Sequence, residues 1–192
     1  MMTFVPTIRL LDERLDSNKT RKEHEMKNTS ASELPRLGID IGRVLIAAEG
    51  TDGADTSFIG GSLQDALDTP PYEGMFEAVA PLVDRFEGRV WLVSKCGPSV
   101  QAKSRAWLQH HRFFERTGVP PANLRFCLQR PQKADHCREL RITHFIDDRS
   151  DVLHHLEGVV PNRYLFGPQR KPVTVEGLVL LPEWKDAAAL VG

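Results

Sequence analysis

The stretch LGIDIGRVLI (residues 37–46) places an acid, Asp40, inside a run of apolar residues and follows it with Gly42. A short apolar run of this kind predicts a buried strand. An unpaired carboxylate at the end of a buried strand is costly, so Asp40 requires a partner that compensates its charge. The stretch therefore predicts a polar site at the end of a strand.

Five further apolar runs follow, and helical patterns lie between most of them. The runs are RVWLVS (89–94), LRFCL (124–128), THFIDD (143–148), NRYLFG (162–167) and GLVLLP (177–182). Apolar residues recur at helical spacing over residues 72–86, 99–115, 133–140 and 150–156. Strands that alternate with helices predict right-handed crossovers. We therefore expect a Rossmann-like, three-layer α/β fold with a mostly parallel sheet.

Length and composition predict one globular domain. The chain has 192 residues, of which 41% are hydrophobic and 27% charged, enough for one core and short for two. We expect a flexible polar tail over 1–34 and a domain over 35–192. A net charge of −1 gives no electrostatic argument for nucleic acid or membrane. No membrane span is predicted, and three cysteines without a CxxC spacing favour the reducing cytoplasm.

Polar residues end three of the predicted strands. Asp40 ends the first, Ser94 the second, and Asp147 and Asp148 the strand THFIDD, while Lys133 opens the helix before that strand. Ligands of parallel α/β sheets bind beyond the carboxyl ends of the strands. We expect these side chains to gather at one edge of the sheet.

Three gathered carboxylates would repel one another and raise their own pKa values unless a hard cation lay among them. Mg²⁺ is the natural candidate, since it prefers carboxylate, carbonyl and water oxygens and commonly binds with a phosphate. The hydroxyl of Ser94 and the ammonium of Lys133 are suitable donors to phosphate oxygens. Asp40 is then a nucleophile able to form an aspartyl-phosphate.

In this order the residues resemble the four motifs of the haloacid dehalogenase (HAD) superfamily, whose members are mostly Mg²⁺-dependent phosphatases. LGIDIGRVL is similar to the first motif, hhhDxDx[TV], and VWLVS to the second; Lys133 matches the third, and FIDDRSDVL the fourth. The resemblance implies a phosphatase with Asp40, Ser94 and Lys133 in catalysis. Phosphate would bind Ser94 and Lys133, and Mg²⁺ would bind Asp40, the Gly42 carbonyl, Asp147 and Asp148.

The first motif departs from the family at Gly42. In the family an acid stands there, which protonates the leaving group and later activates water, while its backbone carbonyl binds Mg²⁺. Gly42 keeps the carbonyl and lacks the acid. Because general acid–base catalysis contributes about 10²–10⁴-fold, the chain favours substrates with good leaving groups, such as sugar-1-phosphates or acyl phosphates. Glu49, Asp52 and Asp55 are candidates to replace the acid, although an exposed polar turn is the simpler interpretation.

The predicted cap is short. An insertion at about 47–70 has room for a flap and a short turn but not for a multi-helix lid. The resemblance then implies an open site that takes a phosphorylated small molecule or a protein or nucleic-acid end, or a site completed by an oligomer or partner. IDDRSDV also resembles the fourth motif of polynucleotide 3′-phosphatase domains. The alternative is a catalytically impaired HAD-like protein that binds phosphate and metal as an interaction module.

Simpler interpretations exist for several single residues. Ser94 is also a suitable N-cap for the helix that begins near Ser99. Lys103 competes with Lys133, and we interpret it as a solvated surface lysine. Asp151 either supports the site or interacts with a helix dipole. The segment WKDAAALV (184–191) is expected to form a closing helix or a contact surface.

Overall fold

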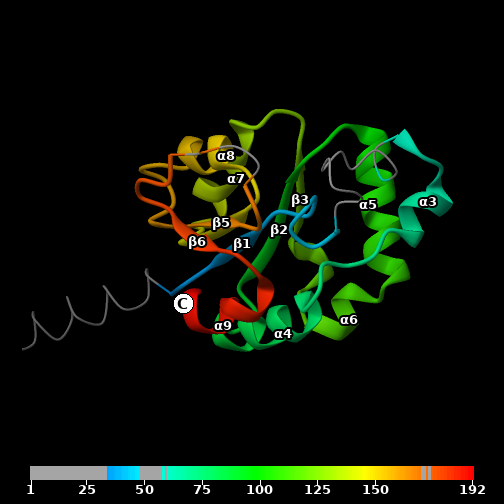
Figure 1. Ribbon diagram of the computed structural model, residues 1–192, viewed down its shortest axis with the longest axis horizontal. Coiled ribbons are helices and arrows are strands. Elements are labelled where there is room, and N and C mark those ends of the chain that lie inside the picture. Colours follow the sequence, from blue (N-terminus) through cyan, green and yellow to red (C-terminus); the bar gives the residue numbers. More distant parts are fainter. Residues whose placement is uncertain (1–33, 48–57, 59, 170–171, 173) are drawn as a thin grey trace, which may run out of the picture. The chain divides into compact units, whose positions relative to one another are not determined.

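The computed structural model describes residues 34–47, 58, 60–169, 172 and 174–192. The chain divides into two units, Met1–Leu34 and Pro35–Gly192, and the fold below is that of the second unit. Its described strands form one sheet in the order β3-β2-β1-β4-β5-β6 (Figure 1). They are β1 (Leu37–Ile39), β2 (Val90–Lys95), β3 (Leu124–Cys127), β4 (His144–Asp147), β5 (Asn162–Phe166) and β6 (Val179–Leu181).

All neighbouring strands of the sheet are parallel. In the middle of the sheet, Ile39 of β1 lies opposite Leu92 of β2 on one side and Ile146 of β4 on the other. The central strands are buried on both faces, which explains why their sequences are continuous apolar runs rather than alternating ones. The predicted α/β fold with a parallel sheet is confirmed.

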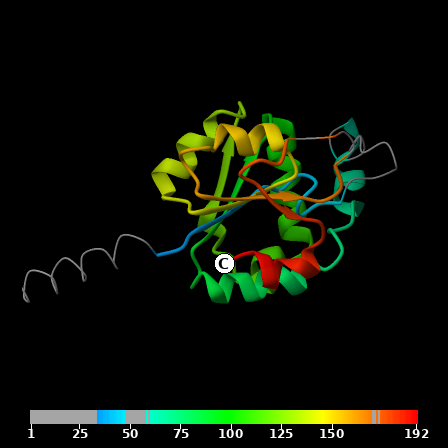
Figure 2. The same cartoon turned by 60° about the vertical axis from the view of Figure 1, so that its left-hand side comes forward.

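Helices cover both faces of the sheet. Helices α4, α5 and α6 pack with the C-terminal segment on one face, and helices α7 and α8 pack on the other. Figure 2 shows the sheet between these two layers. The helices are α3 (Leu63–Asp68), α4 (Met75–Arg85), α5 (Pro98–His110), α6 (Phe113–Thr117), α7 (Gln132–Leu140), α8 (Ser150–His155) and α9 (Ala187–Leu190), with 3₁₀ turns η1 (Pro121–Asn123) and η2 (Trp184–Asp186).

The single helix predicted over residues 99–115 is two helices, α5 and α6. They are separated at Arg112, whose backbone is left-handed with φ of 52°. Helix α5 buries Trp107 and Leu108 on one side. Phe113 follows Leu108 by five residues, so in an unbroken helix with 3.6 residues per turn its side chain would point away from that side. The break lets Phe113 enter the core beside Phe76, with ring centroids 6.2 Å apart.

The insertion before α4 contains a helix, α3, that the sequence had not indicated. Ser62 and Asp65 form a capping box at its start: the Ser62 hydroxyl accepts from the Asp65 amide at 3.1 Å, and the Asp65 carboxylate accepts from the Ser62 amide at 2.7 Å. The end of α3 is held to α5, since Trp107 Nε1 donates to the Thr69 carbonyl at 2.7 Å. Glu49, Asp52 and Asp55 lie outside the described residues.

The interpretation of Lys103 as a solvated surface lysine was wrong. It lies half-buried on α5, and its Nζ donates to the carbonyls of Phe58 at 3.1 Å and Gly61 at 2.5 Å. The ammonium of Lys103 therefore connects the inserted segment to α5. Sequence spacing could not show this, because the two carbonyls come from more than forty residues earlier in the chain.

The C-terminal segment closes the α4 face of the sheet. Trp184, Ala187 and Val191 are buried there. Arg85, in the last turn of α4, donates to the carbonyls of Val191 at 2.5 Å and Ala188 at 2.9 Å. Among the helices in the described ranges, none is long and apolar enough to cross a membrane.

We expect Gly38→Ala to destabilise the protein. A Cβ at Gly38 would lie 2.4 Å from Phe145 Cδ2 and 3.3 Å from Ile142 Cγ2, and Phe145 is fully buried in the core. Overpacking of this kind costs about 1–3 kcal/mol of unfolding free energy. Chemical denaturation measures it, with Gly42→Ala as the control because a Cβ there meets nothing within 4 Å. Equal losses in both variants would contradict the prediction.

Candidate functional site

The strand order reverses between β1 and β4. From β1 the chain crosses to β2 and β3 on one side, and then returns to β4 on the other side of β1. Such a switch point leaves a crevice beyond the carboxyl ends of the two strands. Asp40 directly follows β1 and Asp147 ends β4, so both acids border this crevice.

Three acids form a compact group at the switch point. Asp40, Asp147 and Asp148, called the acidic trio below, each place a carboxylate oxygen within 4.8 Å of the other two. Asp40 and Asp147 are buried, with 7% and 0% of their surface exposed. Buried carboxylates so close together must be compensated by cations.

Lys133 supplies the first compensating charge. It lies in the first turn of α7, on the face that also buries Ala134 and Cys137. Its Nζ is 2.6 Å from Asp147 Oδ2 and 2.9 Å from Asp40 Oδ1. Burial alone would lower the pKa of Lys133, but the two carboxylates outweigh this and raise the pKa above its usual range. The ammonium is therefore held charged between the two acids.

Arg43 supplies the second compensating charge, and the sequence analysis missed it. Its Nε lies 3.3 Å from Asp148 Oδ2. Arg43 is next to Gly42, but nothing in the sequence shows that its side chain turns toward the acids. Gln169 was missed as well: its Nε2 donates to the Asp148 carbonyl at 3.3 Å. It lies outside every motif, so sequence alone offered no signal for it.

The trio keeps a surplus of negative charge, because three carboxylates face two cations. Burial, reinforced by the neighbouring acids, raises the pKa of Asp147 to about 7 and that of Asp148 to about 6. Asp40 Oδ1 is buried and makes an ion pair with the Lys133 ammonium at 2.9 Å, but it accepts no geometrically regular hydrogen bond from the described residues. A buried acceptor in a negatively charged group is suited to bind a cation.

The donor set fits a hard divalent cation. Three carboxylates are available, and the carbonyl of the half-buried Gly42 accepts no hydrogen bond from the described part of the chain. Carboxylate and carbonyl oxygens are the ligands that Mg²⁺ and Ca²⁺ prefer. Asp40, Asp147, Asp148 and the Gly42 carbonyl are thus the residues that could hold such an ion.

The loop after Asp40 has a tightly defined shape. The Ile41 carbonyl accepts from the amides of Leu45 at 3.0 Å and Ile46 at 3.1 Å, and Arg43 has a left-handed backbone with φ of 61°. Trp184 Nε1 donates to the Val44 carbonyl at 2.8 Å, across 140 residues of sequence. The C-terminal segment therefore fixes the loop that carries Gly42 and Arg43.

Ser94 lies at the same edge of the sheet, near the end of β2, with 6% of its surface exposed. No hydrogen bond joins it to the acidic trio in the described structure. The alternative interpretation of Ser94 as an N-cap was wrong, because Gly97 occupies that position before α5. Its hydroxyl is thus not engaged in capping.

Arg149 and Asp151 stand beside the trio as a pair. The Arg149 guanidinium donates twice to the Asp151 carboxylate, at 3.0 Å each, and the Arg149 amide donates to Asp147 Oδ1 at 3.0 Å. Burial raises the pKa of Asp151, but the hydrogen bonds and the positive charge of Arg149 outweigh burial, and the pKa is lowered. Asp151 therefore supports the chain next to Asp147 instead of joining the trio.

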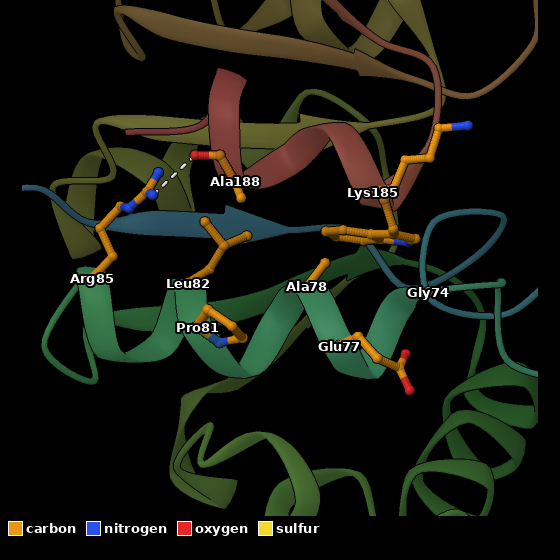
Figure 3. Close-up of a pocket in the computed structure, with 9 residues that line it drawn as sticks. Gly74, Glu77, Ala78, Pro81, Leu82, Arg85, Lys185 and Ala188 are labelled. Carbon is orange, nitrogen blue, oxygen red and sulfur yellow. Dashed lines mark hydrogen bonds between the residues drawn. The ribbon is translucent and has the colours of Figure 1, made fainter.

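A separate cavity of about 280 Å³ lies between α4 and the C-terminal segment (Figure 3). Its walls are mainly apolar and include Leu82, Pro81 and Trp184, and its lining contains none of the acidic trio. Arg85 crosses one end and donates to the Ala188 carbonyl. We assign no chemistry to this cavity.

No protein-family model matches the chain, and no curated protein matches it.

Without divalent ions, we expect the contribution of Asp147 and Asp148 to stability to fall as pH rises from about 4 to about 7. The half-buried His111 and the buried His144 make an opposite contribution, because burial lowers their pKa values. The folded-state pKa values of Asp147 and Asp148 are raised above the ordinary 3.8. The folded state therefore binds protons that the unfolded state releases, and this stabilisation is lost as pH rises through the folded values. Thermal unfolding in a chelator across this range measures the loss, which Mg²⁺ should reduce.

Asp148→Asn should reduce the change in unfolding free energy between pH 4 and pH 7, by on the order of 2 kcal/mol. Asp151→Asn is the control, because the pKa of Asp151 is lowered and its titration falls below this range. An unchanged slope in Asp148→Asn would show that the trio does not carry the effect.

Proposed function

We propose that this protein is a Mg²⁺-dependent phosphohydrolase of the HAD type that works through an aspartyl-phosphate on Asp40. The observation that carries the proposal is the buried Lys133 ammonium between Asp40 and Asp147, inside a trio that keeps surplus negative charge. A nucleophile, a phosphate-binding cation and metal-binding acids thus meet at the switch point of a parallel sheet. The motif resemblance supports the same assignment. We also propose a cytoplasmic location, from the free cysteines.

In the first step Asp40 attacks the phosphorus atom of the substrate. A bond forms between its carboxylate oxygen and phosphorus, and the bond from phosphorus to the leaving oxygen breaks with its electron pair on that oxygen. Lys133 orients Asp40 and donates to a phosphate oxygen, and Ser94 donates to another. A bound Mg²⁺ would screen the carboxylate from the phosphate, held by the trio and the Gly42 carbonyl.

In the second step water attacks the aspartyl-phosphate. The bond between phosphorus and Asp40 breaks, inorganic phosphate leaves, and the carboxylate is restored. The proton lost by water passes to phosphate or solvent, since Gly42 offers no base. Lys133 remains charged throughout and keeps Asp40 in place.

The substrate has room to extend beyond the trio. A cavity of about 910 Å³ lies past the ends of β5 and β6, lined by Leu165, Leu180 and Gln169 among others. The cavity lining contains none of the acidic trio, and the link between them is Gln169, which lines the cavity and donates to the Asp148 carbonyl. The space favours a phosphorylated molecule larger than phosphate itself, or the end of a macromolecule; an oligomer or partner is the further candidate to complete the short cap.

We expect Mg²⁺-dependent phosphate release from an acyl or aryl phosphate, and its complete loss in Asp40→Asn. Mass spectrometry of acid-quenched protein should show a phosphoryl group on Asp40. Asp135→Asn is the matched control, because Asp135 is exposed on the helix that carries Lys133. The result that overturns the proposal is Mg²⁺-dependent stabilisation by phosphate with no turnover and no phosphoenzyme, as the binding-module alternative requires.

We expect Gly42→Asp to improve turnover of substrates with poor leaving groups. A Cβ at position 42 meets nothing within 4 Å, and Gly42 lies outside the left-handed region, so neither a clash at Cβ nor backbone strain opposes the substitution. Restoring an acid there should raise kcat/KM for an alkyl phosphate by about 10–10²-fold and change an acyl phosphate little. Gly42→Ala is the control for shape. Equal rates in the two variants would mean that a missing acid does not limit the reaction.

A further inference from the structure

Arg43 has an unusual backbone conformation at the candidate site. Among the described residues other than glycine, Arg43, Glu87, Arg112 and Arg141 have positive φ. The last three stand where helices begin or end, whereas Arg43 lies in the loop that follows the proposed nucleophile. A left-handed conformation is costly for a residue with a Cβ, and such residues collect at functional sites.

The Arg43 guanidinium is only partly used by the protein. Its Nε pairs with Asp148 Oδ2 at 3.3 Å, and the Asp148 side chain is 8% exposed while that of Arg43 is 34% exposed. Within the described chain, the two terminal nitrogens of the guanidinium have no hydrogen-bond partner. Arg43 therefore presents free donors and a positive charge to solvent at the edge of the trio.

This charge lies at the acidic trio, on the residue that follows Gly42 in the chain. The guanidinium contacts Asp148, and a Cβ on Gly42 would meet nothing within 4 Å. A guanidinium stays protonated in proteins, so it can stabilise an anion and donate hydrogen bonds but has no proton to give. Preorganised donors of this kind stabilise charge that develops in a transition state.

We propose that Arg43 faces the leaving group and stabilises the negative charge that develops on its oxygen. The inference rests on the proposed phosphohydrolase activity. When Asp40 attacks phosphorus, the electron pair of the breaking bond stays on the leaving oxygen, which departs as an anion paired with Arg43 and takes its proton later from solvent. The substrates are therefore acyl phosphates and aryl phosphates, whose leaving groups are stable as anions, and not alkyl phosphates.

Arg43→Gly removes the guanidinium and keeps the backbone conformation of the loop. Glycine adopts a φ of 61° without strain, which offsets part of the stability lost with the Asp148 ion pair, so the variant should fold with a melting temperature at or somewhat below that of the natural chain. Arg141→Gly is the matched control: Arg141 is an exposed arginine with φ of 53° that ends α7 ahead of β4, at the opposite edge of the sheet from the trio. Arg43→Lys keeps the charge and loses the planar group.

The measurement is kcat/KM at saturating Mg²⁺ for acetyl phosphate and a series of substituted phenyl phosphates with leaving groups of increasing basicity. In Arg43→Gly we expect a loss of about 10²-fold for the most basic leaving group and a smaller loss for the least basic one. The plot of log kcat/KM against leaving-group pKa should become steeper. The slope for Arg43→Lys should lie between those of the natural chain and Arg43→Gly. The slope for Arg141→Gly should equal that of the natural chain.

Three other outcomes would each refute a specific part of the proposal. If the natural chain releases no phosphate from any substrate, the proposed function fails and this inference fails with it. If it does turn over, but Arg43→Gly has an unchanged slope, only the role of Arg43 is refuted. An equal loss for every substrate, together with a changed Mg²⁺ requirement, would show that Arg43 acts through Asp148 and not on the leaving group.

Discussion

The contact on which the site and the middle of the fold depend is that of the Lys133 ammonium with Asp147 and Asp40. It connects α7, β4 and the end of β1, and both Lys133 and Asp147 are almost completely buried. Taking such charges out of water is expensive, and removal of one partner leaves an uncompensated charge. A buried pair of this kind is not needed to hold the elements together, because apolar side chains of similar volume often stabilise a protein as well or better.

The balance of charge around this contact explains why the site is suited to a cation. Lys133 and Arg43 offset two of the three carboxylates of the trio, and Asp40 Oδ1 accepts no geometrically regular hydrogen bond from the described residues. Burial raises the pKa values of Asp147 and Asp148, so ionisation of these acids near neutral pH is expected to cost stability when no cation is bound. A bound divalent ion would return that stability, which links metal binding to folding. Next to the trio, Gly42 carries no side-chain proton donor, and Arg43 presents a positive charge that is paired with Asp148.

Much of the fold could be predicted because parallel strands buried on both faces have continuous apolar sequences. Asp40, Asp147 and Lys133 could be grouped because they stand at strand ends or just before a strand, and the carboxyl ends of parallel strands share an edge. The errors arose where tertiary contacts outweighed local pattern. The split at Arg112 follows from the burial of Phe113, and Lys103 is held by carbonyls distant in sequence.

By itself, the sequence determined the parallel α/β architecture and the acids that end its central strands, since apolar periodicity and strand-end position are local properties of the chain. Only the tertiary structure decided how the charges are paired. The contact of Arg43 with Asp148 depends on a left-handed loop, and that loop is held by Trp184 from the far end of the chain. Pairing of charges is a matter of distances in space, and a side chain 140 residues away can set such a distance without leaving any local pattern.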